Sequence, residues 1–135
     1  MKRSRSFILP LGVLCFAIAA NAKVIDASTT VNGVPVHYKA VLPNGFDPAK
    51  QYPAVLAFPP GSQAMDMVMT TLQQNWAAEA QRRGYIVIIP MAPNGRLLHE
   101  EGSKIFPGFL DFLLREYKVR GNKLHVAGMS NGGIS

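Results

Sequence analysis

Cysteine is almost absent from this sequence of 135 residues, in which Cys15 is the single example. It lies in an apolar N-terminal segment that we expect to be removed, so the remaining chain can form no disulfide, thiolate nucleophile or cysteine-ligated metal site. Charged residues are also scarce, at 16% against roughly 25% in average soluble domains. No run of lysine and arginine is interleaved with aromatic residues, and this argues against nucleic-acid binding. The H-E-x-x-H motif of zinc proteases is missing as well.

The first 22 residues have the three parts of a secretory signal peptide. Residues 1–6 carry three basic side chains, residues 7–20 form an apolar run, and Ala20-Asn21-Ala22 matches the A-x-A cleavage pattern. As a helix, that apolar run would span only about 21 Å, against about 30 Å for a bilayer core, so we expect no stable membrane anchor. Cleavage after Ala22 would release residues 23–135 into the periplasm or the extracellular space.

The start of the mature chain has the pattern of a β-hairpin. Residues 24–30 and 34–42 are rich in β-branched side chains and partly alternate between apolar and polar. The segment between them contains Asn32-Gly33, a pair that tolerates positive φ at both central positions of a tight turn.

Strand and helix patterns then alternate. Apolar runs at residues 53–58, 85–89 and 123–127 suit buried strands. Apolar spacing of 3.6 residues predicts helices over residues 65–83 and 106–117, and the second of these has Pro107 in its first turn. Residues 91–103 are expected to form a long loop.

The predicted fold class is therefore α/β. Strands that alternate with helices of this length form right-handed crossovers, which produce a mostly parallel sheet with helices on both faces. The N-terminal hairpin adds to this sheet, and residues 23–135 are one domain at most.

The chemistry is concentrated in a G-x-S-x-G motif, Gly128-Met129-Ser130-Asn131-Gly132. It directly follows the last strand pattern, where a nucleophile elbow exposes a serine on a sharp strand-to-helix turn. Ser130 is the candidate nucleophile, and Gly128 and Gly132 avoid side-chain collisions in that turn. The N–H of Asn131 is a candidate oxyanion donor.

A second oxyanion donor is expected in the loop after residues 53–58. Pro59 and Pro60 have no N–H to give. Gly61 allows close approach of the backbone, and the Ser62 N–H is the candidate donor.

These motifs resemble the α/β-hydrolase superfamily, and more narrowly the secreted esterases related to polyhydroxybutyrate depolymerases and feruloyl esterases. The resemblance rests on AVLAFPPGSQ, GYIVIIP, FLLREYKV and KLHVAGMSNGG, and it spans roughly residues 35–135, the N-terminal half of that fold. These relatives usually have His-Gly where this chain has Pro60-Gly61, so the glycine carries over and the histidine does not.

The resemblance implies a triad in the order serine, acid, histidine. Only five residues follow Ser130, and none is an acid or a histidine. His125 lies in the strand that feeds the motif and is expected to pack under a helix rather than act as the base. We therefore expect the acid and the histidine beyond Ser135, in a protein about twice as long. Without that part, residues 123–127 would be a bare edge strand, and the chain would be inactive.

The implied activity is hydrolysis of a small-molecule or polymeric ester through an acyl-enzyme, with no metal or cofactor. Two alternatives remain open. A peptidase of the prolyl-oligopeptidase type has the same elbow. A non-catalytic exported binding module would be favoured if the chain is complete.

Overall fold

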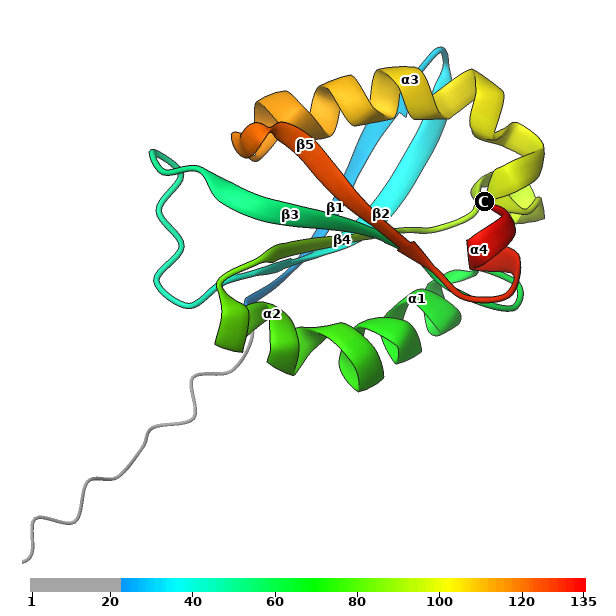
Figure 1. Cartoon of the computed structure of the whole chain (residues 1–135). Coiled ribbons are helices and arrows are strands. Elements are labelled where there is room, and N and C mark those ends of the chain that lie inside the picture. The colour runs from blue at the N-terminus through cyan, green and yellow to red at the C-terminus, as the bar shows by residue number, and fades with distance from the viewer. Residues whose placement is uncertain (1–22) are drawn as a thin grey trace, which may run out of the picture.

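The computed structural model describes residues 23–135, and the predicted signal peptide lies outside the described residues. Five strands form one sheet in the order β1-β2-β4-β3-β5 (Figure 1). Their bounds are β1 Lys23–Val31, β2 Val34–Leu42, β3 Tyr52–Phe58, β4 Ile86–Pro90 and β5 Val119–Gly128.

The predicted hairpin and parallel crossovers are both confirmed. β1 and β2 pair antiparallel around Asn32 and Gly33, which have φ of 50° and 81° as a two-residue turn of this kind requires. β3 pairs parallel with β4 and with β5, whereas β2 pairs antiparallel with β4. The parallel part of the sheet is thus β4, β3 and β5, and the hairpin extends it on one side.

Helices cover both faces of the sheet, as predicted (Figure 1). One face carries α3 (Leu98–Glu116), and the other carries α1 (Met65–Thr71), η1 (Leu72–Trp76) and α2 (Ala77–Arg83) in succession. Alternate side chains of the central strands point to opposite faces of the sheet. Leu56 and Ile88 pack on the α3 side, and Val55 and Val87 pack on the other side. None of the helices in residues 23–135 is both long and apolar enough to cross a bilayer.

The predicted helix over residues 65–83 is present but is interrupted. Residues Leu72–Trp76 form a π-helical turn between two α-helical segments. The second segment ends at Gly84, which has a φ of 70° and closes the helix in the left-handed conformation. A pattern of 3.6-residue spacing cannot show such a wide turn, because the apolar face continues through it.

The predicted loop at residues 91–103 is wrong from residue 98 onward. A short 3-10 turn covers Pro93–Gly95, and α3 begins at Leu98, so Pro107 lies inside the helix rather than in its first turn. Leu98 and Ile105 are fully buried, and they extend the apolar stripe of the helix back past the proline. The Glu100 carboxylate also accepts a hydrogen bond from the Leu97 N–H at 2.7 Å, which caps the earlier start.

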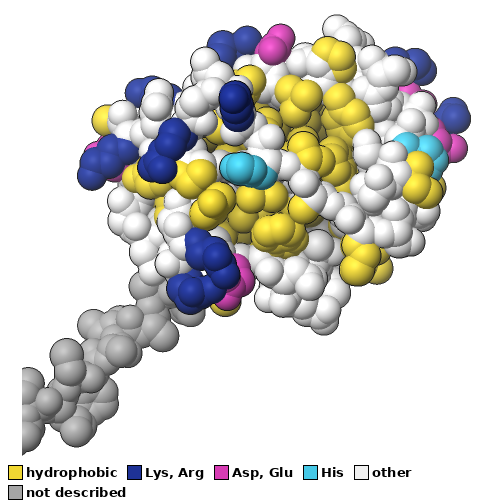
Figure 2. All heavy atoms as spheres, viewed as in Figure 1, with side chains coloured by type: hydrophobic (Ala, Val, Ile, Leu, Met, Phe, Trp, Pro, Cys, Tyr) yellow, Lys and Arg dark blue, Asp and Glu magenta, His cyan; other side chains and the backbone are white. Residues whose placement is uncertain are grey.

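β5 starts four residues earlier than predicted and lies at the sheet edge of the described chain. Its pairing with β3 shifts register between Val119 and Leu124, where Gly121 and Asn122 both have positive φ. Within residues 23–135 His125 is exposed on this strand, so no helix of the described chain covers it, in contrast to the expectation. Figure 2 shows apolar side chains gathered on the face where β5 lies, and Val126 is 67% exposed.

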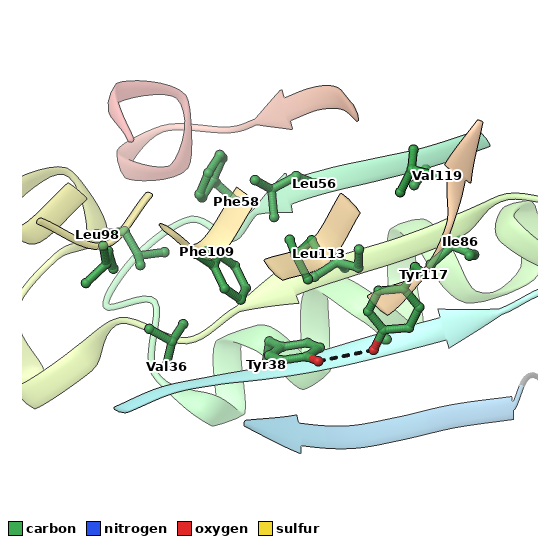
Figure 3. Packing of buried hydrophobic residues seen from close by; sticks show 14 of the residues in the cluster. Val36, Tyr38, Leu56, Phe58, Ile86, Leu98, Phe109, Leu113, Tyr117 and Val119 are labelled. Carbon is green, nitrogen blue, oxygen red and sulfur yellow. Dashed lines mark hydrogen bonds between the residues drawn. The ribbon is translucent and has the colours of Figure 1, made fainter. Parts of the chain in front are cut away.

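A buried tyrosine pair joins the hairpin to the end of α3 (Figure 3). The Tyr117 hydroxyl donates to the Tyr38 hydroxyl at 3.2 Å. Burial raises the pKa of both phenols, and the exposed Glu116 carboxylate raises both further. For Tyr38 this outweighs the opposing effect of its hydrogen bond with Tyr117.

The tyrosine pair makes stability fall at alkaline pH. Above about pH 10 an unfolded tyrosine loses its proton, whereas the buried pair keeps its protons, so the folded state binds more protons and loses stability as pH rises. We expect the free energy of unfolding to fall less steeply between about pH 9 and 11 when both Tyr38 and Tyr117 are replaced by phenylalanine. Equal slopes in urea titrations of the two proteins would contradict this assignment.

Candidate active site

Ser130 lies on a sharp turn between the end of β5 and α4 (Asn131–Ile134). Its backbone has φ of 54° and ψ of −125°, a conformation that a residue with a side chain rarely adopts. Such a conformation persists only where the surrounding structure enforces it. The turn leaves Ser130 exposed.

Two glycines allow the close packing that enforces this turn. A Cβ on Gly128 would overlap the Gly132 carbonyl oxygen and lie 2.8 Å from the Gly133 nitrogen. A Cβ on Gly132 would overlap the carbonyl oxygen of Phe58, the last residue of β3. The obstacles are backbone atoms, which cannot rotate away as a flexible side chain could. The two ends of the turn therefore pack closely against each other, and the turn packs closely against the end of β3.

The loop after β3 lies beside this turn, although the two are far apart in sequence. The Asn131 side-chain amide donates to the Gly61 carbonyl oxygen at 2.9 Å, which joins residues 70 positions apart. Ser62 lies between two residues with left-handed backbone, Gly61 at φ 64° and Gln63 at φ 57°. The Ser62 hydroxyl accepts from the Ala64 N–H at 3.3 Å, and within residues 23–135 the Ser62 N–H has no acceptor.

The sequence motifs therefore meet at one place, at the C-terminal ends of β3 and β5. Neither the loop residues 59–64 nor residues 128–135 contain an ionisable side chain. Charge developing on a bound molecule here would be met by backbone and amide dipoles. Neither of these two segments contains a histidine, and no cluster of residues suited to a metal ion is found in the described part of the chain.

A cavity of about 160 Å³ opens next to the turn. Met129, Pro60 and Thr71 contribute to its lining, together with Asn75 and Trp76 of the π-helical turn. This recess could not be predicted from the sequence, because its walls come from three separate segments, residues 57–60, 71–76 and 127–129. It offers apolar space beside the turn that exposes Ser130.

Sequence reasoning also overlooked Gln63. It directly follows Ser62 in the loop after β3, and its side chain is completely buried. The sequence does place a large polar residue directly after Pro59-Pro60-Gly61-Ser62, in the segment that connects β3 to the first helix. A polar side chain that is buried there requires hydrogen-bond partners.

No protein-family model matches the chain, and no curated protein matches it in sequence. Solved structures do match in three dimensions. A ferulic acid esterase has a TM-score of 0.64 at 18% identity and covers 84% of this chain and 52% of its own. A structure described as a dipeptidyl aminopeptidase IV from Bacteroides ovatus has a TM-score of 0.63 at 20% identity, covering 87% and 19%. The feruloyl esterase module from Clostridium thermocellum, in complex with sinapinate, has a TM-score of 0.61 at 17% identity, covering 84% and 47%.

These neighbours include esterases and a peptidase, and what they share with this chain is the arrangement of sheet and helices. The chain spans about half of the length of the two esterases and about a fifth of the peptidase. At these identities the likeness establishes the fold. Residues 23–135 therefore have the architecture of part of the α/β-hydrolase fold.

Proposed function

We propose that this protein is a serine hydrolase that cleaves carboxylic esters through an acyl-enzyme on Ser130. The observation that carries the proposal is the backbone of Ser130, held at φ 54° and ψ −125° on an exposed strand-to-helix turn. A strained serine in this position costs stability, and such strain is concentrated at functional sites. The hydroxyl therefore lies at the C-terminal ends of β3 and β5, beside the loop that contains Gly61 and Ser62.

In the proposed reaction Ser130 Oγ attacks the ester carbonyl carbon while a histidine accepts its proton. The carbonyl electrons move to the oxygen, and the N–H groups of Asn131 and Ser62 donate to that oxyanion. Collapse expels the alcohol, which takes the proton from the histidine, and water then hydrolyses the acyl-enzyme. Both N–H groups belong to segments joined by the Asn131–Gly61 hydrogen bond.

The base and the acid are proposed to come from a segment C-terminal to Ser135. In this fold the acid and the histidine follow the nucleophile along the chain. Each experiment on activity therefore uses the natural gene product, as its host makes it. No metal or cofactor enters the proposed steps.

The proposed substrates are small-molecule or polymeric esters. Two of the structural neighbours are named as a feruloyl esterase and a ferulic acid esterase. A peptidase is the second candidate, because the dipeptidyl aminopeptidase IV structure matches with a nearly equal TM-score. The fold alone does not separate the two activities.

The two candidates differ in their action on amides. We expect the natural protein to hydrolyse p-nitrophenyl esters of short acyl chains and a feruloyl ester, with no release of p-nitroaniline from peptide anilides that have proline before the scissile bond. The readout is the initial rate of chromophore release. Cleavage of the anilides would favour the peptidase, and failure to cleave either class would contradict a hydrolase and favour a binding module.

A further inference from the structure

Gln63 is the most completely buried polar side chain in residues 23–135, with an exposed fraction of 0%. It is also strained, since its φ of 57° is unfavourable for a residue with a side chain. A buried amide needs partners for both its donors and its acceptor. The partners of Gln63 are spread over several segments of the chain.

The Gln63 side chain makes three hydrogen bonds. Its Nε2 donates to the Pro59 carbonyl oxygen at 3.0 Å and to Ser135 Oγ at 3.2 Å. Its Oε1 accepts from the Leu98 N–H at 2.8 Å. In addition, the Gln63 carbonyl oxygen accepts from the Ala92 N–H at 2.8 Å. One residue thus links the end of β3, the segment after β4, the first residue of α3 and the end of α4.

The bond to Ser135 connects Gln63 to the turn that presents Ser130. Ser135 Oγ donates in turn to the Asn131 carbonyl oxygen at 2.9 Å. On the other side of Ser62, the Gly61 carbonyl oxygen accepts from the Asn131 side chain. Ser62 is therefore flanked by Gly61 and Gln63, and each of these two residues is hydrogen-bonded to the segment 131–135.

We propose that Gln63 is a positioning residue that fixes the spacing between the Ser62 N–H and the Asn131 N–H, the two donors of the oxyanion hole. This inference rests on the proposed function. Such donors must lie about 2.7–3.1 Å from the oxyanion to stabilise it. They come from two segments that are far apart in the sequence, and the loop segment is strained at Gln63, where φ is 57°. The hydrogen bonds of Gln63 hold these two segments at a fixed spacing. Gln63 itself lies outside the oxyanion hole and does not contact the substrate.

The test replaces Gln63 in the natural protein with glutamate and, separately, with methionine. Gln63→Glu keeps the shape but removes the Nε2 donors and places a carboxylate opposite the Pro59 carbonyl oxygen. Gln63→Met keeps the length of the side chain without adding charge, so it covers the case in which the buried carboxylate prevents folding. We expect kcat for an ester to fall about 10²–10³-fold in both variants with KM nearly unchanged, because the oxyanion forms only in the transition state.

A pH profile separates positioning from a loss of fold. In Gln63→Glu, the introduced carboxyl group can again donate to the Pro59 carbonyl oxygen and accept from the Leu98 N–H once it is protonated, whereas the thioether of Gln63→Met cannot. The ratio of the Gln63→Glu kcat to the wild-type kcat should therefore rise as pH falls, and the Gln63→Met ratio should stay flat. Gln81→Glu is the matched control: Gln81 lies on α2, and its buried Nε2 has no partner in the described chain. Its kcat should match that of the wild type.

The outcomes distinguish the inference from the function on which it rests. If Ser130→Ala retains ester hydrolysis, both the proposed function and the positioning role are overturned. If Ser130→Ala loses it while folded Gln63→Met retains wild-type kcat, only the positioning role is overturned. A loss of kcat in Gln63→Met accompanied by a matching rise in KM would also overturn it, because that pattern indicates a collapsed binding site.

Discussion

Replacement of Ser130 by alanine is expected to lower kcat for ester hydrolysis by about 10⁶-fold, the scale of loss when the nucleophile of a serine hydrolase is removed. The change deletes one hydroxyl and leaves the backbone of the turn as it is. Without that oxygen no acyl-enzyme can form, so the remaining rate would come from the oxyanion donors and substrate binding alone. The measurement is kcat on a p-nitrophenyl ester with the natural protein and with the variant.

A second substitution at the same position separates chemistry from strain. Ser130→Gly should be just as inactive, but it should raise the free energy of unfolding by about 1 kcal/mol, because glycine adopts positive φ at little cost. Ser130→Ala should leave stability nearly unchanged, since alanine has the same Cβ. Activity retained in either variant would exclude Ser130 as the nucleophile.

Gly132→Ala is expected to lower both the stability and the activity of the protein, although the nucleophile itself is unchanged. Its Cβ would overlap the Phe58 carbonyl oxygen and lie 2.8 Å from that of Pro59. Relief requires the turn to move away from β3 and from the loop that precedes Ser62. We expect a loss of about 1–3 kcal/mol in the free energy of unfolding and a loss of most of the activity, because the nucleophile and the loop would separate. Urea titration and the ester assay measure the two effects.

The next residue provides a matched control for this substitution. A Cβ on Gly133 would lie 3.6 Å from the Gly128 carbonyl oxygen, which is an ordinary contact. Gly133→Ala should therefore be tolerated, and it should stabilise α4 by up to about 1 kcal/mol, as alanine does in helices. Equal loss of stability in Gly132→Ala and Gly133→Ala would show that the close contact with β3 is not what constrains position 132.

The features that the sequence predicts well are those with a local physical cause. Asn32-Gly33 determines the hairpin because few other pairs accept positive φ at two successive positions. The apolar runs at 53–58 and 85–89 become central strands of the sheet. The G-x-S-x-G motif predicts a turn after the last strand pattern, and the turn is there, since the backbone geometry around Ser130 depends on its neighbouring glycines.

The errors arise where distant contacts override local preference. Pro107 suggests a helix start, yet α3 begins at Leu98, because burial of Leu98 and Ile105 favours the earlier start. Nothing in the sequence near Gln63 shows that its partners are Leu98 and Ser135, which lie 35 and 72 positions away. The cavity beside Met129 is likewise formed by segments that only the fold brings together.

The central claim is that Ser130 is an activated nucleophile, and covalent labelling tests it most directly. The natural protein would be treated with a serine-directed phosphonate and digested, and the modified residue would be located by mass spectrometry. The proposal predicts a phosphonyl adduct on Ser130 that disappears in Ser130→Ala. The absence of an adduct, or an adduct on the neighbouring loop serine Ser62, would contradict it.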